Sequence, residues 1–226
     1  MIDLAICIAS RGLVHSRTME SVLDNIKGLS FPCKFFFTHD LPIPDAQNKL
    51  VQDALDWGAD YLWFVEEDML IPPDTFLKMI QMGKQIVAVD YPVGEKRYSC
   101  IAKKKDEILW CGLGCTLIRQ EVFEIIPSPW FETDKTVRIT NEDPFEYVID
   151  KDIPYKYGGH DILFGIKTRE KGVEITQLEG ITAGHIKPAP VKKDYEPGSQ
   201  SKKEGSNKGN YEFEIWNEIK NFQNYN

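Results

Sequence analysis

The chain has 226 residues, which is long enough for one substantial core and too short for two large domains. Its 42% hydrophobic and 27% charged residues are typical of a globular protein. Lys and Arg total 27 against 35 Asp and Glu, giving a net charge of -8. Because phosphate neutralisation needs a basic face, this balance disfavours a nucleic-acid partner.

Targeting features are absent from the sequence pattern. No apolar run reaches the roughly 18 residues of a transmembrane segment, and the first residues begin a strand rather than a signal peptide. The five cysteines lie mostly in apolar segments, which favours reduced thiols. Cys111 and Cys115 lack a second pair at zinc-site spacing, so we interpret them as core residues. We expect a cytoplasmic protein.

Strand and helix patterns alternate through the first half of the chain, and Ser16 is the expected cap of the first helix. Such β-α-β alternation is typical of a parallel, doubly wound sheet. The expected strands are 4–9, 33–38, 61–65 and 85–89, and the expected helices are 17–26, 46–57 and 73–80.

After residue 90 the pattern changes to short strands, which predict an antiparallel extension of the same sheet. The expected elements are strands 99–102, 107–110, 115–118 and 173–177, helices 120–125 and 161–171, and an irregular segment through 154. The predicted fold class is therefore α/β, with a mixed, mainly parallel central sheet flanked by helices. We expect one Rossmann-like domain over residues 1–187.

Two further segments follow the predicted domain. Residues 188–210 are rich in Lys, Gly, Ser and Pro, which indicates a polar flexible segment. Residues 211–226 place apolar side chains at helical spacing and predict an amphipathic helix. This helix would dock on the body of the protein or join two subunits of a homo-oligomer. Membrane-surface binding is a weaker alternative, because the polar face is acidic.

The run Tyr61–Val65 ends in three consecutive carboxylates, Glu66, Glu67 and Asp68. A wholly apolar run of this kind predicts a strand buried on both faces of a parallel sheet. Its carboxyl end lies at the edge where open α/β sheets bind ligands, and three like charges there favour a bound cation such as Mg²⁺ or Mn²⁺. Alternatively, the acids solvate a turn before the next helix.

The first strand is followed by Ser10-Arg11-Gly12, which matches neither the dinucleotide-binding glycine pattern nor a phosphate loop. Dehydrogenase and P-loop functions are therefore excluded. Arg11 and Asp40 follow the first two strands at the same sheet edge, where they could meet a phosphate and a base or ribose. Either residue could instead be an ordinary loop residue.

Two later residues carry candidate chemistry. Asp161 follows two glycines at a predicted helix start, so it is either a helix cap or a general base facing the cleft. His185 follows a strand and a glycine, so it is either a solvated imidazole or a metal ligand.

Taken in order from Leu4 to His185, these segments resemble a glycosyltransferase of the nucleotide-diphospho-sugar transferase superfamily. The resemblance is to the A-type fold and the family-two style, including short viral and bacterial members. The strand ending in Ala9-Ser10-Arg11 resembles the family's nucleotide-binding start. Residues 45–49 resemble its Ala-Arg-Asn element, with Gln47 in place of Arg.

The remaining motifs resemble the family's metal and acceptor elements. Glu66-Glu67-Asp68 stands where the family carries Asp-x-Asp, with Glu66 in place of the first Asp. Residues 111–119 resemble a Gly-rich acceptor-side strand, and residues 158–161 resemble a Glu-Asp motif with His160 in place of Glu. Gly184-His185 resembles the histidine that completes the family's metal site.

The resemblance implies a metal-dependent enzyme that transfers a sugar, with inversion, from a UDP- or GDP-linked donor to a hydroxyl of a glycan, protein or lipid. It implies Asp161 as the base and Mn²⁺ or Mg²⁺ held by Glu66, Asp68 and His185. The implied nucleotide contacts are Ala9, Ser10, Arg11, Asp40, Asn48, Glu66 and Glu67, and the implied acceptor contacts are Trp110, Gly112, Gly114 and His160.

Two alternatives remain open. The altered Glu66 and His160 suggest a nucleotide-sugar or glycan-binding module that has lost turnover. A sugar nucleotidyltransferase would need a Gly-rich loop bearing Arg or Lys near the first strand, and the sequence after Ala9 lacks one.

Overall fold

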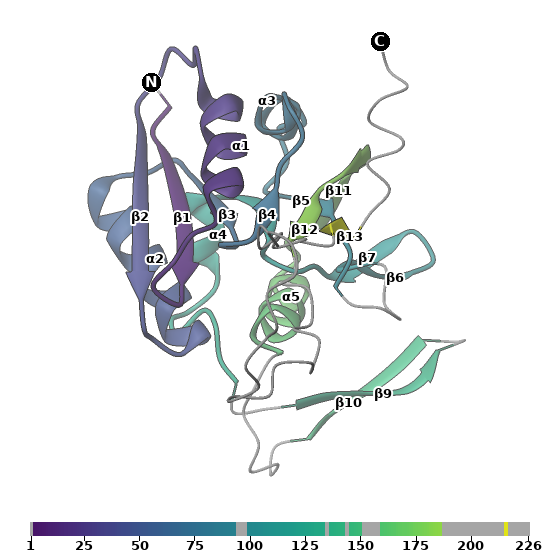
Figure 1. Ribbon diagram of the computed structural model, residues 1–226. Coiled ribbons are helices and arrows are strands. Elements are labelled where there is room, and N and C mark those ends of the chain that lie inside the picture. Colours follow the sequence, from purple (N-terminus) through teal and green to yellow (C-terminus); the bar gives the residue numbers. More distant parts are fainter. Residues whose placement is uncertain are drawn as a thin grey trace, which may run out of the picture.

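The computed structural model describes residues 2–93, 99–133, 136–142, 145–150, 159–186 and 215–216. A six-stranded sheet in the order β11-β5-β8-β3-β1-β2 forms its centre (Figure 1). All neighbouring strands in it are parallel except at β8, which is antiparallel to both β3 and β5. The predicted mixed, mainly parallel α/β fold is confirmed. The strands are β1 (Leu4–Ser10), β2 (Cys33–His39), β3 (Tyr61–Val65), β5 (Ile86–Asp90), β8 (Cys115–Arg119) and β11 (Ile175–Thr182).

The helices α1 (Ser16–Ile26) and α2 (Ile43–Trp57) connect the first three strands. The chain steps outward from β1 to β2 and then back to β3, so right-handed crossovers place α1 and α2 on opposite faces of the sheet (Figure 1). Helix α3 (Thr75–Gln81) lies beside α1, where the buried Asn25 side chain accepts a hydrogen bond from Phe76 N at 3.0 Å.

The helix ends follow local chemistry. His15, rather than the predicted Ser16, caps α1, because its Nδ1 accepts a hydrogen bond from Arg17 N at 3.2 Å. Gly58 ends α2 as predicted, with a left-handed φ of 89° that favours glycine. Helix α3 begins at Thr75 rather than at Pro73.

The second half differs from the sequence prediction in three ways. Strand β8 lies inside the sheet between β3 and β5, not at its margin. Strands β6 (Ala102–Lys104) and β7 (Glu107–Trp110) pair with each other in a separate two-stranded sheet. Where an irregular segment was expected, β9 (Thr136–Glu142) and β10 (Phe145–Asp150) form an antiparallel pair.

Helices α4 (Gln120–Ile125) and α5 (His160–Glu170) complete the described helices. None of the helices in the described ranges has both the length and the apolar character needed to cross a bilayer.

A third sheet joins β4 (Met69–Leu70), β12 (Gly184–Ile186) and β13 (Ile215–Trp216). The sequence predicted none of these short strands. At 215–216, where the sequence predicted helix, the described residues form a strand that pairs with His185 and Ile186 of β12. The predicted domain boundary at 187, the segment 188–210 and the rest of 211–226 lie outside the described residues.

One continuous core holds the sheet to its helices. Trp63 of β3 packs on Phe76 of α3 with ring centroids 5.2 Å apart, and Phe131 packs on Phe164 of α5 at 4.8 Å. Burying each such side chain stabilises the fold by about 1.5–3 kcal/mol. This packing fixes the strand ends from which the candidate site is built.

Candidate functional site

The acidic segment after β3 lies where the sequence predicted, at the carboxyl end of that strand. Glu66 N donates to Gly114 O at 3.2 Å, which links the acids to the loop before β8. The chain then enters β4, where Met69 pairs with His185 of β12. Ile186 N also donates to Asp68 O at 2.7 Å. These backbone bonds bring a distant histidine beside the acids.

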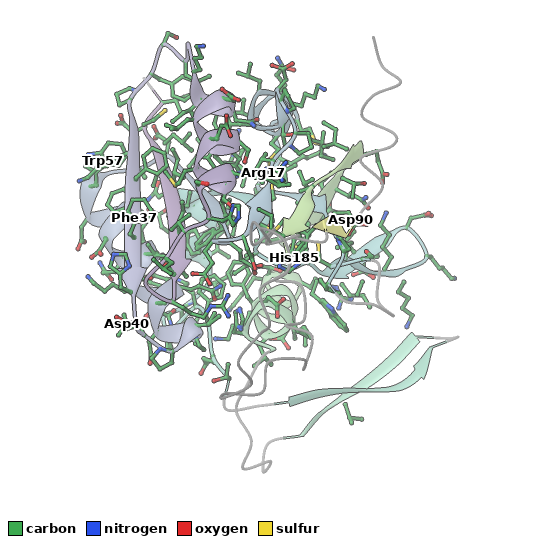
Figure 2. All side chains as sticks on the ribbon, viewed as in Figure 1. Arg17, Phe37, Asp40, Trp57, Asp90 and His185 are labelled. Atoms are coloured by element: carbon green, nitrogen blue, oxygen red, sulfur yellow. The ribbon has the colours of Figure 1, made fainter. Side chains whose placement is uncertain are left out.

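Glu66, Asp68 and His185 form one cluster, as predicted. One ligand atom from each lies within 4.8 Å of the other two, and His185 Nε2 is 3.3 Å from Asp68 Oδ1. His185 Nδ1 lies 2.9 Å from Pro92 O, so an Nδ1–H tautomer leaves Nε2 facing the acids. Figure 2 labels His185 near the middle of the molecule, close to Asp90 at the end of β5.

The charged groups of this cluster shift one another's pKa values. Burial raises the pKa of Glu66 to about 7, and the neighbouring carboxylates act in the same direction while His185 opposes them. Burial lowers the pKa of His185, but the hydrogen bond and charge of Asp68 outweigh it, so the net shift is upward. Two carboxylates and one imidazole fit a divalent cation, and the imidazole favours Mn²⁺ over Mg²⁺.

Glu67 points away from this cluster and holds the loop after β1. Its carboxylate accepts a hydrogen bond from Arg11 N at 2.8 Å and pairs with the Arg11 guanidinium. Its backbone carbonyl accepts from His15 N at 2.9 Å and from Thr18 Oγ1 at 3.1 Å. The Arg11 side chain is 80% exposed, and a phosphate there would compete with Glu67 for it.

The other predicted nucleotide contacts lie on the loops after β1 and β2. Ser10 Oγ donates to Leu13 O at 3.1 Å and accepts from Gly12 N at 3.0 Å, so it closes a turn. Asp40 is exposed, and its Oδ1 would be 3.8 Å from a Cβ built on Gly12. The two loops are therefore neighbours. The roles of Ala9, Ser10, Arg11 and Asp40 stay predictions.

Asn48 has a structural partner that the sequence did not indicate. Its Nδ2 donates to Phe131 O at 2.8 Å, and Phe131 N donates to its Oδ1 at 3.0 Å. This reciprocal pair clamps α2 to the segment before residue 133. The predicted contact of Asn48 with a nucleotide stays a prediction. The sequence signal for its hydrogen bonds with Phe131 was a short amide side chain beside the apolar face of a helix.

A cavity of about 260 Å³ is lined in part by Tyr91, whose ring contacts His185 of the acidic cluster. Its lining includes Tyr91, Cys100, Trp110, Gly112, His160 and Asp161. Asp161 lies in the first turn of α5, whose cap is Gly159 with φ 85°, so the helix-cap interpretation of Asp161 is wrong. The Asp161 carboxylate accepts from Ile162 N at 2.8 Å, and its charge raises the pKa of Glu66.

Tyr91 lies between the cavity and the acidic cluster, and the sequence did not indicate a role for it. Its ring meets the His185 ring edge-on at 5.7 Å, and its hydroxyl accepts from Gly114 N at 2.9 Å. A Cβ at Gly112 would overlap the Tyr91 hydroxyl, and one at Gly114 would lie 2.6 Å from Tyr91 Cζ. The glycines are thus required by the Tyr91 ring. The sequence signal for Tyr91 was its position directly after β5, at the carboxyl edge of the sheet.

The two remaining acceptor candidates differ in environment. Trp110 is 1% exposed, and helix α5 packs so closely on it that a Cβ at Gly165 would lie 2.6 Å from Trp110 Cβ. Its ring therefore offers little free surface for a sugar. Burial lowers the pKa of His160. Its Nδ1 has no hydrogen-bond partner within the described part of the chain. The acceptor roles of both residues, and of Gly112 and Gly114, stay predictions.

The interpretation of Cys111 and Cys115 as core residues is confirmed. Both are buried and free, and burial raises the pKa of each thiol to about 12. They are therefore unreactive thiols near neutral pH.

No family model matches the sequence, and no curated protein matches it. Among solved structures, the chain is similar to A197 from STIV, with a TM-score of 0.56 and 19% identity over 82% of this chain and 85% of that one. At this identity the likeness shows a shared fold.

Other solved structures are more distant. One is a glycosyltransferase involved in the glycosylation of the major capsid of PBCV-1, with a TM-score of 0.36 and 12% identity over 57% of this chain and 70% of that one. Another is 4-diphosphocytidyl-2C-methyl-D-erythritol synthase from Anaerococcus prevotii DSM 20548, with a TM-score of 0.42 and 9% identity over 78% and 88%. Likenesses at these scores carry no argument about activity.

Proposed function

We propose that this protein is a metal-dependent glycosyltransferase that moves a sugar from a nucleotide-diphosphate donor to an acceptor hydroxyl. The observation that carries the proposal is the cluster of Glu66, Asp68 and His185 at the carboxyl edge of a mainly parallel sheet. Asp161, a carboxylate on a separate element, lines the adjoining cavity. The site thus combines a candidate cation site with a candidate base.

Asp68 and Glu66 supply anionic oxygens for Mn²⁺ or Mg²⁺, and His185 supplies a nitrogen that the Pro92 carbonyl orients. When bound, such a cation acts as a Lewis acid that stabilises negative charge on a leaving diphosphate. Glu67 acts through the loop after β1, because its carboxylate holds the backbone of Arg11, one of the predicted nucleotide contacts.

Asp161 accepts the proton of the acceptor hydroxyl. The acceptor oxygen forms a bond to the anomeric carbon, the bond from that carbon to the diphosphate breaks, and the nucleoside diphosphate leaves. A positioned base of this kind contributes about 10²–10⁴ in rate. Attack opposite the leaving group predicts an inverted anomeric configuration. The proposed donors are UDP- or GDP-linked sugars, and the acceptor is a glycan, protein or lipid hydroxyl.

The decisive experiment measures nucleoside diphosphate release with a panel of nucleotide sugars and acceptors, with Mn²⁺ and with a chelator. The wild type should turn over only with the metal, and Asp68→Asn should lose that turnover. Asp24→Asn is the matched control, because it makes the same change on an exposed residue of α1. Undiminished turnover by Asp68→Asn would refute the proposal.

Two further measurements, of nucleotide-sugar binding and of pyrophosphate release, separate the two alternatives. Metal-dependent binding of nucleotide sugars without turnover on any acceptor would indicate a binding module. Release of pyrophosphate from a nucleoside triphosphate and a sugar phosphate would indicate a nucleotidyltransferase. Either result would replace the glycosyltransferase proposal.

A further inference from the structure

Strand β2 is an open edge of the central sheet. It pairs with β1 on one side, and no described strand pairs with it on the other (Figure 1). An edge strand of seven residues presents a row of backbone donors and acceptors that can template a further strand.

The pairing with β1 shows which backbone groups of β2 point outward. Leu4 is the partner of Cys33 in the parallel register, and Leu4 N donates to Pro32 O at 3.0 Å. Since backbone groups alternate along a strand, residues 32, 34, 36 and 38 face β1. The backbone groups of Phe35 and Phe37 therefore face away from the sheet.

The side chains of the same residues form an aromatic row on one face of the strand. The rings of Phe35 and Phe37 stack at 5.9 Å with an interplanar angle of 7°. The Phe37 and His39 rings follow at 6.3 Å and 10°. Phe36 lies on the other face, against Trp57 of α2 at 5.8 Å. Phe37 is 39% exposed, on the side of the molecule away from His185 (Figure 2).

The apolar surface continues past the end of β2. Leu41 is 43% exposed and Ile43, the first residue of α2, is 40% exposed. Three large exposed apolar side chains thus fall within seven consecutive residues. Such a concentration beside an open strand edge is characteristic of an interaction surface.

We propose that β2 pairs antiparallel with β2 of a second copy of this chain, about a two-fold axis at Phe36. In this register Phe35 lies opposite Phe37 of the second copy, and Phe37 lies opposite Phe35 of the second copy. Both residues have outward backbone groups, so each pair exchanges two hydrogen bonds. The aromatic rows of the two copies then form one continuous ladder.

The backbone pattern of β2 favours the antiparallel arrangement over a parallel, in-register one. Lys34 is the one charged residue among Cys33–His39 when the histidine is neutral. In the antiparallel register Lys34 lies opposite Thr38 of the second copy. A parallel, in-register pair of the two edges is excluded, because a parallel ladder sets each residue that faces the partner strand opposite one that faces away, as Leu4 and Cys33 show. The sequence of β2 is thus self-complementary, as an isologous two-fold interface requires.

The test is sedimentation velocity from low micromolar to several hundred micromolar protein. The wild type should shift from monomer to dimer with concentration, and Phe37→Lys should stay monomeric because it places a charge on the edge. Leu77→Lys is the matched control, because Leu77 is 37% exposed on α3 and lies outside the interface. Circular dichroism and thermal unfolding confirm that both variants fold.

A second experiment tests the register. Cys33 lies opposite His39 of the second copy, so His39→Cys should give a disulfide-linked dimer when oxidised glutathione removes two electrons and two protons from the paired thiols. His39→Cys combined with Cys33→Ser should give no such link between these positions. A wild type that stays monomeric at every concentration, or a dimer that survives Phe37→Lys, overturns the proposal. Survival would indicate another interface, such as the C-terminal region.

Discussion

The carboxylate of Asp68 and the imidazole of His185 lie 3.3 Å apart because backbone pairing places them there. Met69, the next residue after Asp68, pairs with His185, and Ile186 N donates to Asp68 O. The relative position of Asp68 and His185 is thus set by the pairing of two short strands, β4 and β12. Because the backbone holds these two side chains together, removing either one should have a direct effect on metal binding.

His185→Ala should weaken Mn²⁺ binding at least about tenfold, because it removes the one nitrogen donor of the cluster. Titration calorimetry of the metal alone measures this effect without any assay of turnover. His39→Ala, an exposed histidine on β2, should bind Mn²⁺ as the wild type does. Equal affinities for all three proteins would remove His185 from the metal site.

Metal affinity should fall as the pH drops below about 7, the raised pKa of Glu66. A protonated carboxyl cannot act as a ligand, and the raised pKa of His185 acts in the same direction. Each proton that must leave lowers the apparent affinity about tenfold per pH unit below its pKa. Calorimetry in buffers of different ionisation heats should detect proton release on binding. Binding without proton release would contradict this prediction.

The metal-free protein should show the opposite dependence in its stability. The pKa of Glu66 is higher in the folded protein, at about 7, than its ordinary value of 4.5, so the folded state binds more protons between these values. The contribution of Glu66 to the free energy of unfolding is complete below pH 4.5 and is lost as the pH rises through 7. Chelator-treated Glu66→Gln should lose less stability over this range than the chelator-treated wild type.

Gly112→Ala should destabilise the protein by about 1–3 kcal/mol, because the new methyl group overlaps the Tyr91 hydroxyl. Tyr91→Phe removes that hydroxyl and relieves part of the overlap. Urea unfolding of the two single variants and the double variant should therefore give a double-variant loss smaller than the sum. Additive losses would mean that Tyr91 does not limit the Gly112 site.

Asn48→Ala should lower the free energy of unfolding by about 1–3 kcal/mol, since the Phe131 N–H and carbonyl lose their partners. In a chain of this size that corresponds to a fall in Tm of about 2–4 °C per kcal/mol. Gln52→Ala, which changes an exposed amide on the same helix, should have a much smaller effect. A stable Asn48→Ala variant with weakened nucleoside diphosphate binding would instead favour the predicted nucleotide contact.

Much of the fold follows from local pattern. The alternating apolar segments from Leu4 to Val89 predict β1, α1, β2, α2, β3 and β5 to within a few residues, because each element has a strong period and a clear stop. The place of Glu66 and Asp68 at the carboxyl end of β3 was also predicted, since strand ends of a parallel sheet meet at one edge, whereas the addition of His185 to the cluster came from the family resemblance.

Among the missed elements, β4 and β12 depend on long-range pairing. Strands β4 and β12 are two and three residues long, so their own sequences carry no period, and they form through each other. Tyr91 and the Asn48 clamp were missed for a similar reason. Their roles depend on Gly114 and Phe131, which the chain brings near only when the sheet is assembled.

The reversed direction of β8 has a consequence for how this site can diversify. Because β8 begins at the edge where its neighbours end, the turn that enters it reaches the cavity, which Gly112 lines. The β6–β7 hairpin directly precedes that turn in the chain. Lengthening or shortening this hairpin would reshape the cavity, and the hydrogen bond from Glu66 N to Gly114 O would pass part of the change to the acidic cluster. The shape of the cavity and the position of Glu66 therefore vary together in this architecture, because the turn into β8 contacts both.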